Sequence, residues 1–108
     1  MASLKERVMG LQATLEGNAQ KNKGITGAFQ FDISGDDGGQ FFFQLNDGAF
    51  VAGGEGTHDN PNITVSMNSA DFLDMLDGKL NGTMAFMSGK LKIKGDMALA
   101  MKLEGIIK

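Results

Sequence analysis

The chain has 108 residues, which is enough for one domain with a modest hydrophobic core. Ten basic and thirteen acidic side chains give a formal net charge of −3, which argues against nucleic-acid binding, because phosphate recognition depends on clustered lysine and arginine. The chain has no cysteine, which excludes disulfides and thiol chemistry, and its single histidine excludes a multi-histidine metal site.

The first segment is predicted to be an amphipathic helix. Its apolar residues recur at spacings of three and four, which places them on one face: Leu4, Val8, Leu11, Leu15 and Ala19. A polar connection over 18–23 follows and is closed by Gly24.

Four strands are predicted next, because the apolar period changes to two. They cover about 27–33, 40–45, 49–52 and 63–67. Asp47-Gly48 predicts a tight hairpin turn between the second and third strands, because this pair accepts positive φ angles. One sheet face is apolar, and the other carries Thr, Ser, Gln and Lys and is expected to be solvated. The loop over 53–62, which contains His58, is expected to be polar and solvated.

The remainder is predicted to return to helix. A helix capped by Asn68 or Ser69 ends at Gly78, and a short helix covers 80–87. A fifth strand, at about 90–94, and a last helix from Met97 to about Ile107 complete the chain. The order predicts an α+β fold over 1–108 as a single domain: a five-stranded, mainly antiparallel sheet with helices covering one face.

Catalytic chemistry is not indicated. His58-Asp59 is the only neighbouring His–acid pair, and adjacent side chains rarely face each other. The other acidic residues occupy turns or helix-capping positions, so local structure accounts for them. We therefore expect no enzymatic activity, no bound metal and no cofactor.

The second half of the chain is rich in flexible apolar side chains. Six of the eight methionines lie between Met67 and Met101, and methionine suits both irregular cores and promiscuous apolar ligands. The last helix is apolar nearly all round, whereas a terminal helix usually buries one side only. Its second face is expected to be covered by another subunit, a membrane surface or a bound apolar molecule.

A family resemblance appears in the same region. The stretch LDGKLNGTMAFMSGKLKIKGDMALAMKL, from Leu76 to Leu103, resembles the signature of the sterol carrier protein type-2 family, the non-specific lipid-transfer domain. Its most specific part is Ala85 to Leu103, and Ser69 to Phe72 agrees with it. Two positions differ from the family pattern: Asn81-Gly82 replaces a frequent acid–proline pair, and Ile106-Ile107-Lys108 is not a peroxisomal signal.

The resemblance implies an apolar cavity under the helices that binds fatty acids, acyl-CoA, phospholipids or sterols and transfers them between membranes without catalysis. The expected lipid-binding residues are Phe31, Phe43, Val65 and Ile93 as the floor, and Phe72, Leu76, Met84, Met87, Met97, Met101 and Ile106 as the wall. Lys21 and Lys23, in the loop after the first helix, are the expected headgroup-binding residues. Each of these side chains also has a purely structural interpretation, as core packing or as solvated surface.

The lysines of the fifth strand likewise have two interpretations. Lys90, Lys92 and Lys94 either draw the domain to anionic membranes or discourage edge-to-edge aggregation. We expect a cytoplasmic, monomeric, stand-alone domain of a bacterium or archaeon. The alternative function is a protein-interaction or dimerisation module whose cavity is collapsed.

Overall fold

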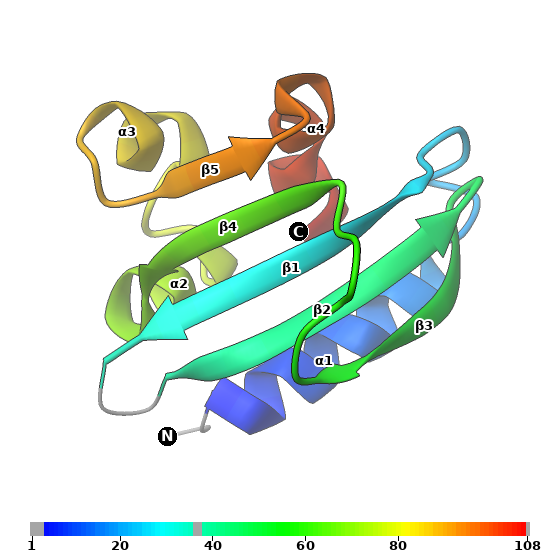
Figure 1. The fold of residues 1–108 in the computed structure, drawn as a ribbon, viewed down its shortest axis with the longest axis horizontal. Coiled ribbons are helices and arrows are strands. Elements are labelled where there is room, and N and C mark those ends of the chain that lie inside the picture. Colours follow the sequence, from blue (N-terminus) through cyan, green and yellow to red (C-terminus); the bar gives the residue numbers. More distant parts are fainter. Residues whose placement is uncertain (1–3, 36–37, 108) are drawn as a thin grey trace.

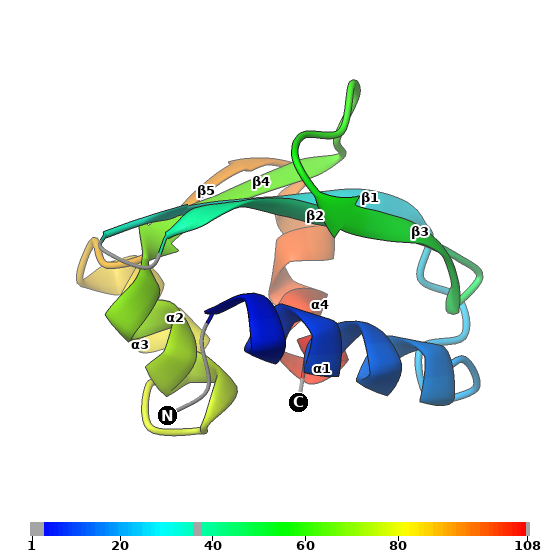
Figure 2. The same cartoon turned by 90° about the horizontal axis from the view of Figure 1, so that it is seen from below.

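The computed structural model describes residues 4–35 and 38–107, with side chains as far as residue 102. The elements are α1 (Leu4–Gly17), β1 (Gly27–Ser34), β2 (Gly39–Asn46), β3 (Ala49–Glu55), β4 (Ile63–Asn68), α2 (Ser69–Leu76), α3 (Gly82–Met87), β5 (Lys92–Gly95) and α4 (Met97–Ile107). Figure 1 shows one twisted sheet, and the turned view of Figure 2 places all four helices on the same face of it. The predicted α+β fold with helices over one sheet face is confirmed.

The five strands are arranged in the order β3-β2-β1-β4-β5. All neighbours are antiparallel except β1 and β4, which pair in parallel with Phe31 opposite Val65. The parallel pair arises because the β2–β3 hairpin folds back on one side of β1, and the chain then crosses to its other side. Figure 2 shows this crossing segment (green) rising above the face that carries no helix. The sheet is therefore mixed, although mainly antiparallel as predicted.

The turn between β2 and β3 is tied to the segment between α1 and β1. Asp47 and Gly48 have φ angles of 51° and 86°, as the sequence predicted for this hairpin. The backbone N–H of Gly24 donates to the Asp47 carboxylate over 2.8 Å, and that of Gly48 donates to the carbonyl of Ile25 over 2.9 Å. A side chain at position 48 would collide with the backbone of Ala19 and Asn22, so only glycine fits there.

Stacked phenylalanines fill the centre of the helix-covered face. Phe31 lies 4.8 Å from Phe41, 5.5 Å from Phe43 and 5.8 Å from Phe72, measured between ring centroids. All four rings are buried. Because β1 and β2 are central and Phe72 comes from α2, this cluster fastens α2 to the middle of the sheet.

The opposite face is less solvated than the sequence predicted. Gln30 is only 4% exposed, since the segment after β3 covers it. Its side chain accepts a hydrogen bond from the His58 backbone over 2.7 Å and donates to the Gly56 carbonyl over 3.2 Å. His58 is half-buried and its ring lies 5.6 Å from that of Phe42, so the prediction of a solvated loop was wrong at these positions. A buried amide needs hydrogen-bond partners, and the crossing segment supplies them.

The helix boundaries follow local capping. The Asn68 side chain accepts a hydrogen bond from the backbone N–H of Asp71 and caps α2, and Gly78, with a φ of 77°, follows its end. Asn81 caps α3, which therefore begins at Gly82, two residues later than predicted. Within the described ranges, none of the helices is long and apolar enough to cross a bilayer.

One ion pair connects α1 to the residue that ends α2. Arg7 Nη2 lies 2.6 Å from Asp77 Oδ1, and this hydrogen bond, with the nearby charges of Arg7 and Lys79, holds the pKa of Asp77 below its ordinary value. A lowered folded-state pKa means that the pair stabilises the protein above the unfolded-state pKa, near 4. This contribution is lost as the pH falls through the folded-state pKa.

We expect Asp77→Asn to lower the free energy of unfolding modestly at pH 7, because the pair is partly solvated. The difference from the unsubstituted protein should shrink as the pH falls below about 4. Urea unfolding of both proteins from pH 7 to pH 3 measures it. A difference that is constant with pH would show that the pair contributes nothing.

Candidate functional site

An apolar hollow lies under the β5 edge of the sheet, among α2, α3, β5 and α4. This hollow, the α4 cavity, has a volume of about 270 Å³. It is lined by Met75, Gly82, Thr83, Phe86, Leu91, Ile93, Met97, Ala100 and Met101. Among the side chains that the structure describes, as far as residue 102, Thr83 contributes the only polar side chain of this lining, and none of the lining residues is charged. The α4 cavity is therefore suited to a hydrocarbon group.

Local structure explains how these side chains come together. On β5, Ile93 alternates with Lys92 and Lys94, so the apolar side chain faces the helices while the lysines face away. Gly95 has a φ of 116° and lies against the backbone of Asn62, where a β-carbon would collide. The Asp96 side chain then accepts a hydrogen bond from the Leu99 N–H over 3.2 Å. This cap starts α4 directly beside β5 and turns Met97, Ala100 and Met101 toward the hollow.

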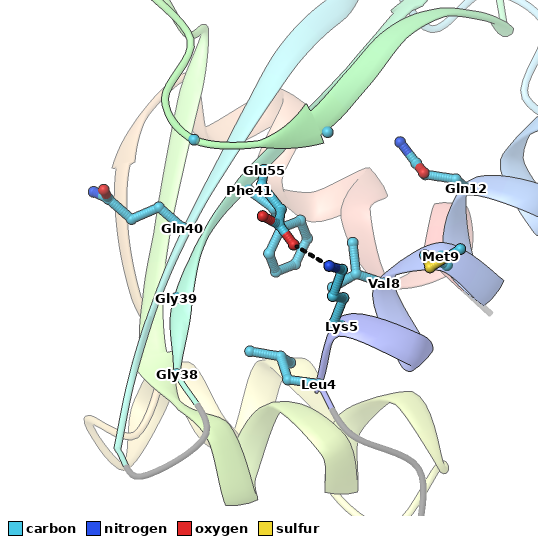
Figure 3. A pocket seen from close by; sticks show the side chains of 12 residues that line it. Leu4, Lys5, Val8, Met9, Gln12, Gly38, Gly39, Gln40, Phe41 and Glu55 are labelled. Carbon is cyan, nitrogen blue, oxygen red and sulfur yellow. Dashed lines mark ion pairs between the residues drawn. The ribbon is translucent and has the colours of Figure 1, made fainter.

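A second hollow lies under the opposite edge, between α1 and the β2–β3 pair. This α1 cavity has a volume of about 550 Å³. Figure 3 shows Leu4, Val8 and Phe41 in its wall, and Lys5 and Glu55 pointing toward each other. Lys5 Nζ lies 3.5 Å from Glu55 Oε1, and both side chains are largely exposed. Gly39 also lines this hollow, and an added β-carbon there would meet open space.

The two hollows differ in chemistry. The lining of the α1 cavity includes Lys5, Gln12, Gln40 and Glu55, whereas the described lining of the α4 cavity has a threonine hydroxyl as its only polar side-chain group. An alkyl chain in the α1 cavity would have to displace water from charged and amide groups, which costs free energy. The smaller α4 cavity therefore favours an apolar guest more strongly.

Part of the predicted lipid-binding set lies at the α4 cavity and part does not. Ile93, Met97 and Met101 line it. Phe72 is fully buried, and Leu76 packs against the core beside it. The other three expected floor residues are buried in the core and line neither hollow: Phe31, Phe43 and Val65. The two phenylalanine rings belong to the stacked cluster under the middle of the sheet, in which Phe31 contacts Phe41 and Phe43.

The other predicted residues lie at the surface or outside the described side chains. Met84 and Met87 are 65% and 78% exposed and line neither hollow. Lys21 and Lys23 are both exposed, in the segment after α1. Ile106 belongs to the last turn of α4, beyond the side chains that the structure describes.

Several lining residues were missed by the sequence analysis. Phe86, Thr83 and Ala100 border the α4 cavity. Their positions along the two helices, relative to Gly82 and Met97, were the sequence feature that could have indicated this. The sequence analysis also did not predict that Asn22 is buried. It is only 2% exposed between two exposed lysines, and its Nδ2 atom has no hydrogen-bond partner among the residues that the structure describes. Nothing in the polar sequence around Asn22 distinguishes it.

A metal site requires several ligating side chains that lie close together. Among the described residues, no cluster of three or more His, Asp or Glu side chains is arranged to hold a metal ion. His58 lies on the other face of the sheet, where its Nδ1 accepts a hydrogen bond from the Asn60 N–H over 3.0 Å. Its ring stacks edge-on to Phe42, which is a structural role.

The chain thus combines a mixed five-stranded sheet, helices on one face and an apolar hollow beneath them. The model of the SCP-2 sterol transfer family matches residues 8–108, and the chain belongs to this family.

Its relatives include proteins named hydroxysteroid dehydrogenase-like protein 2. The chain is 46% identical to that of Xenopus tropicalis over 90 residues, which are 83% of this chain and 22% of the relative. It is 49% identical to the human protein over 86 residues, which are 79% of this chain and 20% of the relative. The chain thus spans about a fifth of the length of these curated relatives.

Solved structures share the fold. The palmitated SCP2L2 of Aedes aegypti, determined by NMR, has a TM-score of 0.80 at 24% identity, and the match covers 98% of this chain and 95% of that one. The apo form of sterol carrier protein 2 from Yarrowia lipolytica has a TM-score of 0.71 at 23% identity, with 96% and 89% covered. At these identities the likeness concerns the fold.

Proposed function

We propose that this domain binds one lipid acyl chain in the α4 cavity and carries it between membranes without catalysing a reaction. The observation that carries this proposal is the lining of that cavity, which within the described part of the chain has no charged group and one hydroxyl. Membership of the SCP-2 sterol transfer family supports it, and so does the fold shared with a palmitated relative.

The size of the α4 cavity favours flexible acyl chains over sterols. Its volume of about 270 Å³ lies at the lower limit of ligand pockets, which are typically about 300–1,000 Å³. A long chain therefore requires side chains at the rim to move. Met97 and Met101 are 45% and 84% exposed, and methionine is unbranched, so both adapt at little cost. A rigid sterol would require a larger rearrangement.

The polar end of the ligand is expected to stay near solvent. The proposal therefore covers fatty acids, acyl-CoA and phospholipids, whose headgroups differ but whose chains are alike. Lys21 and Lys23 remain candidates for contacting an anionic headgroup. A monomer in the cytoplasm is the form in which we expect the domain to act.

Filling the α4 cavity from within tests its role. Ala100 lines it, whereas Ala98 is exposed on the same helix, so Ala98→Leu is a matched control for Ala100→Leu. The added leucine carbons would exclude two or three ligand methylenes, worth about 0.8 kcal/mol each. We expect Ala100→Leu to weaken palmitate binding roughly 15- to 60-fold and Ala98→Leu to leave it unchanged. Displacement of a fluorescent fatty acid measures both.

A third variant separates the two hollows. Gly39 lines the α1 cavity, shares a face with Phe41, and has free space where a side chain would begin. Gly39→Leu should fill the α1 cavity without weakening palmitate binding. If Gly39→Leu abolished binding while Ala100→Leu retained it, the α1 cavity would be the lipid site and the assignment to the α4 cavity would be wrong.

A further inference from the structure

The rim of the α4 cavity is unusually apolar for a protein surface. Large exposed apolar side chains lie on the two helices that border it: Met84, Phe86 and Met87 on α3, and Met97 and Met101 on α4. We call these five residues the methionine face. Phe86, Met97 and Met101 also line the cavity, so its mouth opens through this face. Contiguous exposed apolar surface of this kind marks contact with a protein or a membrane.

Positive charge is concentrated in the same part of the chain as the methionine face. Residues 79–102 contain five lysines and a single acidic residue, Asp96, whose carboxylate is already engaged in capping α4. All five lysines are exposed: Lys79, Lys90, Lys92, Lys94 and Lys102. Residues 1–78, in contrast, hold four basic and eleven acidic side chains. Figure 1 shows α3 and α4 at the two ends of β5, at one edge of the sheet, so the cationic part of the chain forms one side of the molecule.

We propose that the methionine face docks on an anionic bilayer, with the mouth of the α4 cavity turned toward the lipids. This inference rests on the proposed function and adds where and in which orientation the domain meets the membrane. Methionine and phenylalanine side chains would enter the interfacial region while the lysines contact anionic headgroups. An acyl chain would then pass between the bilayer and the cavity without crossing water.

Charge argues for a membrane over a second copy of the chain. A two-fold dimer through this face would bring the same surface together with itself. The lysines of both copies would then be close, and Asp96, the one acidic residue within 79–102, is already engaged in capping α4. An anionic surface complements the same lysines.

Two substitutions that leave the cavity lining intact test the apolar contact. Met84 and Met87 line neither hollow, and glutamine matches methionine in length and helix propensity. The control removes comparable apolar exposure elsewhere: Met9 and Val51, which are 60% and 53% exposed, become Gln and Thr. In flotation with phosphatidylcholine–phosphatidylserine vesicles, we expect Met84→Gln with Met87→Gln to lower binding at least tenfold and the control to bind normally.

A second pair tests the charge. Lys90→Gln with Lys102→Gln removes two charges beside the methionine face, and Ala13→Glu with Gln20→Glu changes the net charge equally at exposed sites on or just after α1. Each lysine near an anionic surface is worth about a fivefold change in binding, so the first pair should lower it roughly 10- to 30-fold and the second far less. Binding to vesicles of phosphatidylcholine alone should be weak throughout.

The chain has no cysteine, so single labels report the orientation directly. An environment-sensitive fluorophore on Met87→Cys should shift to the blue with anionic vesicles, and one on Val51→Cys should not. Equal shifts, a dimer formed through this face, or normal vesicle binding by the Met84/Met87 variant would each overturn the inference. Palmitate binding in solution separates the two proposals. An unsubstituted protein that binds no palmitate would contradict the proposed function. A protein that binds palmitate but does not dock on anionic vesicles would contradict only this inference.

Discussion

Replacing Phe31 with alanine is expected to lower the free energy of unfolding by about 3–5 kcal/mol. Phe31 is 0% exposed, and its ring contacts those of Phe41, Phe43 and Phe72. The substitution leaves a void at the point where α2 joins the sheet. It also removes three aromatic contacts, each worth about 0.5–1.5 kcal/mol beyond the buried area. Urea unfolding, followed by circular dichroism, measures the loss.

The same variant distinguishes closed core from ligand-contacting floor. Phe42→Ala is the matched control, because Phe42 is a half-buried residue on the other face of the same sheet and should cost much less. If Phe31 only packs, saturating palmitate should stabilise the variant by as much as it stabilises the unsubstituted protein. A small change in stability, together with a large loss of palmitate affinity, would instead make Phe31 part of the lipid site.

Saturating palmitate is expected to raise the melting temperature by about 10 °C or more. A ligand that binds only the native state at about 100 times its dissociation constant stabilises a protein by about 2.7 kcal/mol. For a domain near 100 residues, each kcal/mol corresponds to a shift of about 4–8 °C. Differential scanning calorimetry of delipidated protein, with and without palmitate, measures the shift.

The cavity variants sharpen this result. Ala100→Leu fills part of an apolar hollow and should itself stabilise the ligand-free protein by about 0.5–2 kcal/mol, while it loses most of the palmitate-induced shift. Ala98→Leu should keep that shift. An unsubstituted protein whose melting temperature is unchanged by palmitate, acyl-CoA and phospholipid would contradict lipid carriage and favour the alternative of an interaction module with a collapsed cavity.

The sequence determined most of the local structure. Phe29, Phe31 and Ile33 alternate with polar residues and form β1, Asp47-Gly48 makes the hairpin turn, and α4 spans Met97–Ile107 as predicted. These features depend on side-chain period, turn chemistry and capping groups, all of which are contained in a few neighbouring residues. The stretch from Ala85 to Leu103 also carried the family resemblance that the family match over residues 8–108 confirms.

Tertiary structure alone decided how the strands pair and where space remains. The alternation of apolar and polar residues indicates which face of β1 is apolar. It does not indicate that β4 pairs with β1 in parallel or that the His58 backbone lies over Gln30. A cavity is the small difference between the volume that the backbone encloses and the volume that side chains fill. Phe31 and Met97 look equally suited to a lipid site in the sequence. Phe31 lies where three other rings close the core, and Met97 lies where Gly82 and Ala100 are too small to do so.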